Sequence, residues 1–96
     1  MDKTHFTARL REALCLTKVN MKEAGRRAGI SYHASLDIIN GNVRPTRKNA
    51  RKLSKVALDA INDRVHDKTD EMIELRRAGL ALKEAYREEY EKQNDN

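Results

Sequence analysis

The sequence contains few residues of several types that stabilise small proteins or bind metals in them. Its one cysteine, Cys15, excludes an internal disulfide and a cysteine-rich metal cluster. It has no tryptophan and one phenylalanine, and Val, Ile, Leu and Phe together make up 19 of its 96 residues. The amino end is charged, and no apolar run is long enough for a signal peptide or a membrane span. We therefore expect a cytoplasmic domain with a thin core, for which a second copy would bury further apolar surface.

Catalytic groupings are also missing from the sequence. The three histidines, His5, His33 and His66, are too scattered for a metal-ligand motif. No carboxylate pair, nucleophile with an adjacent base, or glycine-rich phosphate loop emerges. The sequence predicts a protein that is not an enzyme and that has no metal and no cofactor.

Charge is unevenly distributed along the chain. Residues 1–66 hold fourteen Lys and Arg against six Asp and Glu, whereas residues 67–96 hold six against nine. The interval from Arg44 to Lys55 contains six basic residues and no acid. A solvated face is one interpretation of such a run, and a phosphate-binding surface is the other. The split predicts a basic DNA-binding part at residues 1–66, followed by an acidic part that phosphate would repel.

Apolar periodicity and capping residues predict helices over residues 4–16, 21–28, 32–40, 46–64 and 70–91. Asn20, Ser31 and Thr46 are placed as N-caps, and Gly29 and Gly41 as left-handed helix ends. A break between the last two helices is expected near residues 66–69. Two short helices joined by a turn that contains glycine are typical of a helix-turn-helix, although a helical hairpin that only completes a core has the same pattern.

The last predicted helix carries apolar residues at alternating spacings of three and four, as in the seam of a short coiled coil. This seam predicts a homodimer; the alternative is that the helix packs back on its own domain. The predicted domains are a helix-turn-helix DNA-binding domain at 1–66 and a C-terminal amphipathic helix with a frayed acidic end at 67–96. The proposed dimerisation residues are Met72, Leu75, Gly79, Leu82 and Tyr86.

Several motifs between residues 20 and 57 occur in the order of a known family. They are Gly29-Ile30-Ser31 at the turn, Ile38, Asn40-Gly41 followed by Pro45, and Leu53 with Lys55. With them the chain resembles the Cro/C1-type (Xre) helix-turn-helix family, without a gap from Asn20 to Ala57. The resemblance implies an all-α, lambda-repressor-like domain of four helices, here with an added C-terminal dimerisation helix. Met21 stands where the family usually has a phosphate-clamping Gln, and Ser35 where it has a core aliphatic residue.

The start of the second helix of such a unit reads base edges in the major groove of DNA. The predicted base-reading residues are Tyr32, His33, Ser35, Leu36 and Asp37. Backbone phosphates set the register of the protein on the duplex. The predicted phosphate-binding residues are Lys22, Arg26, Ser31, Arg44, Arg47 and Lys48.

The predicted function is sequence-specific binding of double-stranded DNA by a homodimeric regulator. We expect a repressor, of the kind that phages or mobile elements encode, that binds an inverted repeat near its own gene. The acidic C-terminal part is a candidate contact for polymerase. The alternative is an antitoxin, which binds a toxin protein through another surface and regulates its own operon.

Overall fold

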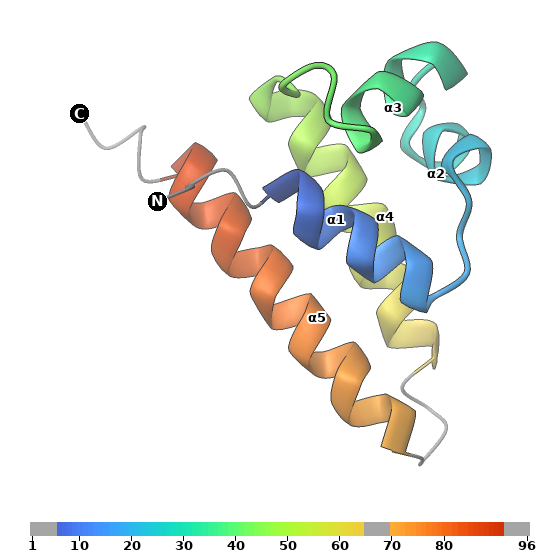
Figure 1. Ribbon diagram of the computed structural model, residues 1–96, viewed down its shortest axis with the longest axis vertical. Coiled ribbons are helices and arrows are strands. Elements are labelled where there is room, and N and C mark those ends of the chain that lie inside the picture. The colour runs from blue at the N-terminus through green and yellow to red at the C-terminus, as the bar shows by residue number, and fades with distance from the viewer. Residues whose placement is uncertain (1–5, 65–69, 92–96) are drawn as a thin grey trace.

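The computed structural model describes residues 6–64 and 70–91, whose secondary-structure elements are all helices, joined by turns and without a strand. The helices are α1 (Phe6–Leu16), α2 (Met21–Ala28), α3 (Tyr32–Ile39), α4 (Arg47–Arg64) and α5 (Asp70–Tyr86), and α5 continues into a π-helical turn, η1 (Arg87–Glu91). The all-α prediction is confirmed. The predicted break at residues 66–69 lies outside the described residues, but α4 and α5 are separate helices that pack side by side (Figure 1).

The helix ends have the local chemistry that the sequence predicts. The side chains of Asn20, Ser31 and Thr46 accept hydrogen bonds from the backbone amides three residues later, at 2.8, 3.2 and 3.2 Å. Gly29 and Gly41 have φ angles of +74° and +83°, a backbone conformation that glycine adopts without strain. These caps fix where α2, α3 and α4 begin, and therefore which side chains stand at the start of α3.

A single hydrophobic core joins the helices. In Figure 1, α5 runs along α1 and α4, while α2 and α3 cover the other side of α1 and α4. The largest buried side chains come from both ends of the chain: Phe6, Leu10, Leu53, Leu75 and Leu82. Among the described residues, no helix is long and apolar enough to cross a bilayer.

The predicted dimer seam on α5 faces the protein's own core. Leu75 and Leu82 are fully buried, Gly79 lies against Ile61 and Leu58 of α4, and the half-buried Tyr86 packs on Phe6. Met72 lies outside the residues whose side chains the structure describes. The assignment of this seam to dimerisation is therefore wrong: the thin core of residues 1–66 needs the apolar stripe of α5.

The helices α5 and η1 share the core of the residues that precede them. Leu75, Leu82, Ala85 and Tyr90 belong to the same buried cluster as the side chains of α1 and α4. The predicted boundary at residue 66 falls among residues that are not described, and so does the predicted frayed end at 92–96. In its packing, α5 is part of the domain that holds α2 and α3.

Candidate nucleic-acid interface

The α2 and α3 helices cross closely because a glycine meets a small polar side chain. A Cβ on Gly25 would lie 2.6 Å from the Ser35 hydroxyl oxygen and 3.0 Å from the Ile30 carbonyl oxygen. The Ser35 hydroxyl donates to the Tyr32 carbonyl oxygen at 3.0 Å, and Ser35 is 0% exposed. The prediction that Ser35 reads bases is wrong, because its side chain is enclosed where α3 lies on α2.

The opposite face of α3 is exposed. Tyr32 is 49% exposed, His33 and Asp37 are also exposed, and Leu36 is half-buried. The Tyr32 and His33 rings lie with their centroids 5.8 Å apart at the start of the helix. Ile39 turns into the core instead of Leu36. The structure thus places four of the five predicted base-reading residues at least partly in solvent.

An arginine that the sequence analysis did not select holds the end of α3. The Arg11 guanidinium, on α1, donates from Nε and Nη2 to the Ile39 carbonyl oxygen at 3.0 and 2.7 Å. After that point, the amides of Asn42 and Val43 donate to the Asp37 carbonyl oxygen. Arg11 therefore fixes α3 relative to α1 and satisfies a helix-terminal carbonyl. No local pattern signals this bond, because its partners are 28 residues apart.

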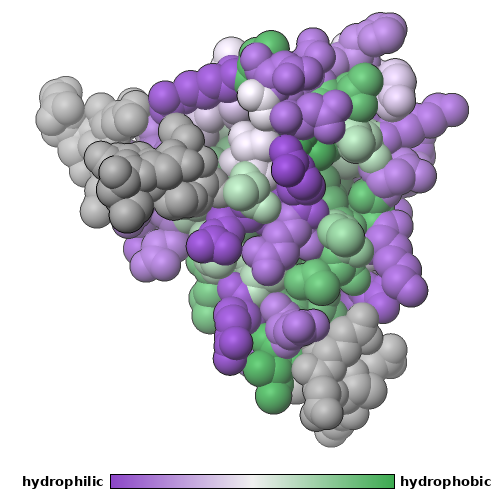
Figure 2. All heavy atoms as spheres, viewed as in Figure 1, coloured by the Kyte–Doolittle hydropathy of each residue, from purple (hydrophilic) through white to green (hydrophobic). Residues whose placement is uncertain are grey.

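The predicted phosphate-binding residues are all solvent-exposed: Lys22, Arg26, Ser31, Arg44, Arg47 and Lys48. In the view of Figure 2, hydrophilic residues cover the upper and right margins of the molecule, over α2 and α3. The turn that follows α3 leads directly into the acid-free stretch from Arg44 to Lys55, where Arg51 and Lys55 are also exposed. Positive charge therefore follows α3 along the chain, and α2, which packs on α3, adds the exposed Lys22 and Arg26.

Glu23 reduces the free positive charge of α2. Its carboxylate accepts hydrogen bonds from Arg26 Nε at 3.0 Å and from Arg27 Nε at 2.8 Å. Two hydrogen bonds lower the pKa of the Glu23 carboxyl to about 2: the bond from Arg26 has the larger effect, and the bond from Arg27 the smaller. The carboxylate is therefore ionised at neutral pH, and two of the cations on α2 share one anion. Lys22 lies on the same helix and is exposed.

Candidate metal ligands do not cluster in the described part of the chain. Within residues 6–64 and 70–91, no three His, Cys, Asp or Glu side chains come together as metal ligands. Cys15 is an exposed free thiol. His5 and His66 lie outside the described residues.

Comparison of the chain with profiles of known protein families, with curated protein sequences and with solved structures found no match. The resemblance to the Cro/C1-type family therefore stays a prediction.

Proposed function

We propose that this protein is a sequence-specific regulator that binds double-stranded DNA, and that it acts as a homodimeric repressor of a phage or mobile-element gene. The proposal rests on one observation: α3 is fixed to the domain by one face and exposes the other. One face of α3 packs on α2 and is held by Arg11 of α1, while Tyr32, His33 and Asp37 stand in solvent and an acid-free run of basic residues follows α3 in the chain. A short helix held in this way fits the major groove, with its first residues toward the bases.

The exposed side chains of α3 have complementary roles in this proposal. His33 donates to or accepts from a purine edge, and Tyr32 bonds to a base or a phosphate. Asp37 accepts from a cytosine amino group, and the exposed part of Leu36 contacts a thymine methyl group. Lys22, Arg44, Arg47 and Lys48, with the shared guanidinium of Arg26 and the Ser31 hydroxyl, bind phosphates and set the register.

The direct test is a fluorescence titration with a duplex from the region upstream of the gene and with a scrambled duplex of the same length. Tighter binding to the upstream duplex, with a log–log salt slope of about −5 to −9, is expected from several displaced counterions. Equal weak binding to the two duplexes would contradict sequence-specific regulation.

Replacement of His33 by alanine is expected to lower the preference for the cognate duplex by about 1–3 kcal/mol, since a base contact discriminates between sequences. Lys48→Ala is the matched control, because a phosphate contact contributes equally on both duplexes and its loss makes the salt slope shallower by about one. Equal losses of affinity on cognate and scrambled DNA in the His33 variant would remove His33 from base reading.

Replacement of Glu23 by glutamine is expected to strengthen binding to both duplexes and to make the salt slope steeper by about one to two, because Arg26 and Arg27 then face phosphate without a competing carboxylate. Glu12→Gln is the control: it removes another surface carboxylate, which pairs with Arg9 at 3.5 Å on α1 and is 51% exposed, against 30% for Glu23. An equal gain of affinity in both variants would mean that net charge, and not the α2 surface, is responsible.

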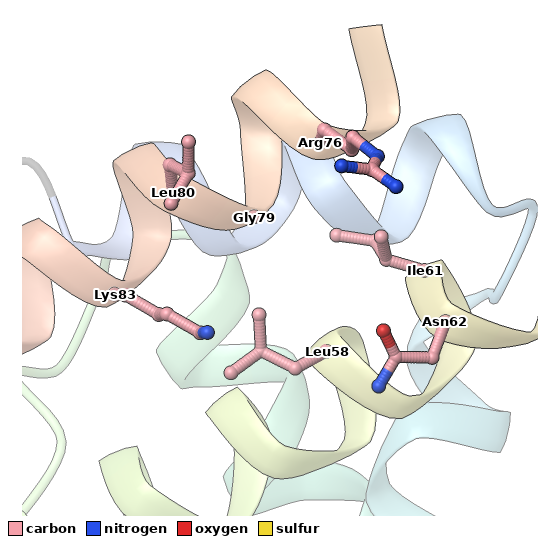
Figure 3. A pocket seen from close by; sticks show the side chains of 7 residues that line it. All are labelled: Leu58, Ile61, Asn62, Arg76, Gly79, Leu80 and Lys83. Atoms are coloured by element: carbon pink, nitrogen blue, oxygen red, sulfur yellow. The ribbon is translucent and has the colours of Figure 1, made fainter. Parts of the chain in front are cut away.

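The homodimer in this proposal needs a surface other than the buried seam. Ile73 and Leu80 are 58% and 66% exposed and lie seven residues apart, on one stripe of α5. Beside this stripe, Leu58 and Ile61 extend from α4 toward α5, and Arg76 and Lys83 of α5 border the groove (Figure 3). We assign this surface to a second copy of the chain.

The Leu80→Glu variant is expected to sediment as a monomer at concentrations at which the unaltered protein is a dimer, since the charge would be buried in the interface. An unaltered protein that is monomeric alone, and that forms a complex only with the product of a neighbouring gene, would favour the antitoxin alternative.

A further inference from the structure

The C-terminal turn η1 contacts the segment that leads into α4. The Tyr90 hydroxyl donates to the Pro45 carbonyl oxygen at 2.8 Å, and the Arg44 guanidinium carbon lies 5.5 Å from the centroid of the Tyr90 ring. Tyr90 thus bonds to the backbone beside Arg44, and its ring makes a cation–π contact with the Arg44 guanidinium. These contacts join residues that are about half the chain apart in sequence.

The Tyr90 ring is itself held from several sides. Phe6 meets it edge-on at 5.6 Å between centroids, and Tyr86 stacks on it at 5.4 Å. The neighbouring Glu89 is buried, and its Oε2 atom accepts a hydrogen bond from the Phe6 amide at 3.0 Å. Tyr90 is 7% exposed. Because α1 and α5 fix the ring, the ring can in turn fix the exposed Arg44.

We propose that Tyr90 is a positioning residue for the DNA interface, and that it holds Arg44 in the orientation in which Arg44 binds a backbone phosphate. This inference rests on the proposed function. A guanidinium that stacks on an aromatic face keeps the N–H donors in its plane available for a phosphate. Its rotamers are already restricted, so less conformational entropy is lost when the phosphate binds.

The protonation of Tyr90 agrees with this role at neutral pH. Burial raises the pKa of the Tyr90 hydroxyl above its usual value of 10.0, while the neighbouring Arg44 guanidinium opposes the rise. The hydroxyl therefore keeps its proton and continues to donate to the Pro45 carbonyl oxygen.

The experiment is a double-mutant cycle of DNA affinity with Tyr90→Leu, Arg44→Ala and the combined variant, each titrated with the upstream duplex at several salt concentrations. Arg44→Ala is expected to weaken binding about fivefold at 0.15 M salt and to make the salt slope shallower by about one, as for one lost phosphate contact. Tyr90→Leu is expected to weaken binding twofold to fivefold, and to have no further effect once Arg44 is alanine.

Two further variants separate positioning from folding. Tyr90→Phe keeps the ring and loses the bond to Pro45, so its smaller loss of affinity is also expected to vanish in the Arg44→Ala background. Leu75→Ala removes a fully buried side chain of the same core, fifteen residues before Tyr90, and leaves the Tyr90 ring with all its contacts. It is expected to lower stability and to leave the affinity of the folded protein unchanged.

The outcomes distinguish the two proposals. Losses from Tyr90→Leu and Tyr90→Phe that are equal with and without Arg44 would overturn the positioning role, although the protein would still bind DNA. An Arg44→Ala variant with unchanged affinity and slope would overturn it as well. Failure of the unaltered protein to bind the upstream duplex more tightly than the scrambled one would overturn the proposed function, and the inference with it.

Discussion

Replacement of Leu82 by alanine is expected to lower the free energy of unfolding by about 3 kcal/mol, within the range of about 2–5 kcal/mol for a fully buried leucine. Leu82 is 0% exposed in the core that α5 shares with α1 and α4. Removal of its branched side chain takes away buried apolar contacts and leaves a cavity. Urea unfolding followed by circular dichroism measures the loss. The loss should be the same at low and high protein concentration, since the side chain lies within one copy.

Leu80→Ala is the matched control for this experiment. It makes the same change two residues earlier, at a side chain that is 66% exposed. Its effect on the unfolding of the monomer should stay within about 0.5 kcal/mol. A loss in Leu82→Ala that grows with protein concentration would instead return Leu82 to a dimer interface and contradict the packing of α5.

Replacement of Gly25 by alanine is expected to lower the free energy of unfolding by about 1–3 kcal/mol, the usual cost of overpacking. The added methyl group would overlap the Ser35 hydroxyl oxygen and press on the Ile30 carbonyl oxygen, which is backbone and cannot rotate away. The intrinsic helix preference of alanine, about 1 kcal/mol over glycine, offsets only part of this cost. Because α3 must shift, the affinity for the cognate duplex should fall as well.

The same substitution at Gly79 provides the comparison. A Cβ there would lie 3.4 Å from the Cδ1 atom of Ile61, the end of a flexible side chain. Gly79→Ala should therefore be neutral, or stabilising by up to about 1 kcal/mol. Ser35→Ala in the Gly25→Ala protein should restore part of the lost stability, because it removes the nearest overlapping atom. Equal effects at Gly25 and Gly79 would show that the α2–α3 crossing is not tight.

The helices could be predicted from the sequence because their ends are determined locally. Asn20, Ser31 and Thr46 cap through bonds to amides three residues away, and Gly29 ends α2 by its own backbone conformation. The apolar stripe on α5 could also be predicted from the sequence. The local sequence does not determine which surface packs against that stripe, because the spacing of three and four residues is the same in a coiled coil and in a core helix. The partner of α5 therefore could not be predicted.

In the candidate site, too, some features are determined locally and others depend on residues that are distant in sequence. The exposure of Tyr32 and His33 follows from the position of the Ser31 cap, and it was predicted. The burial of Ser35 depends on the missing side chain of Gly25, ten residues earlier, and the Arg11 bond to Ile39 spans 28 residues. The pairing of Glu23 with Arg26 and Arg27 was within reach of the sequence, because its members are three and four residues apart on one helix.

The hydrogen bond between the Phe6 amide and the Glu89 carboxylate bears on how the chain folds during synthesis. Phe6 leaves the ribosome well before its buried partners on α5 and η1, and Glu89 lies 83 residues after it. At a synthesis rate of about 5–20 residues per second, this separation corresponds to about 4–17 s. During that interval the apolar side of α1 lacks its cover. Until α5 and η1 are complete, the nascent chain therefore exposes an apolar surface to which chaperones can bind.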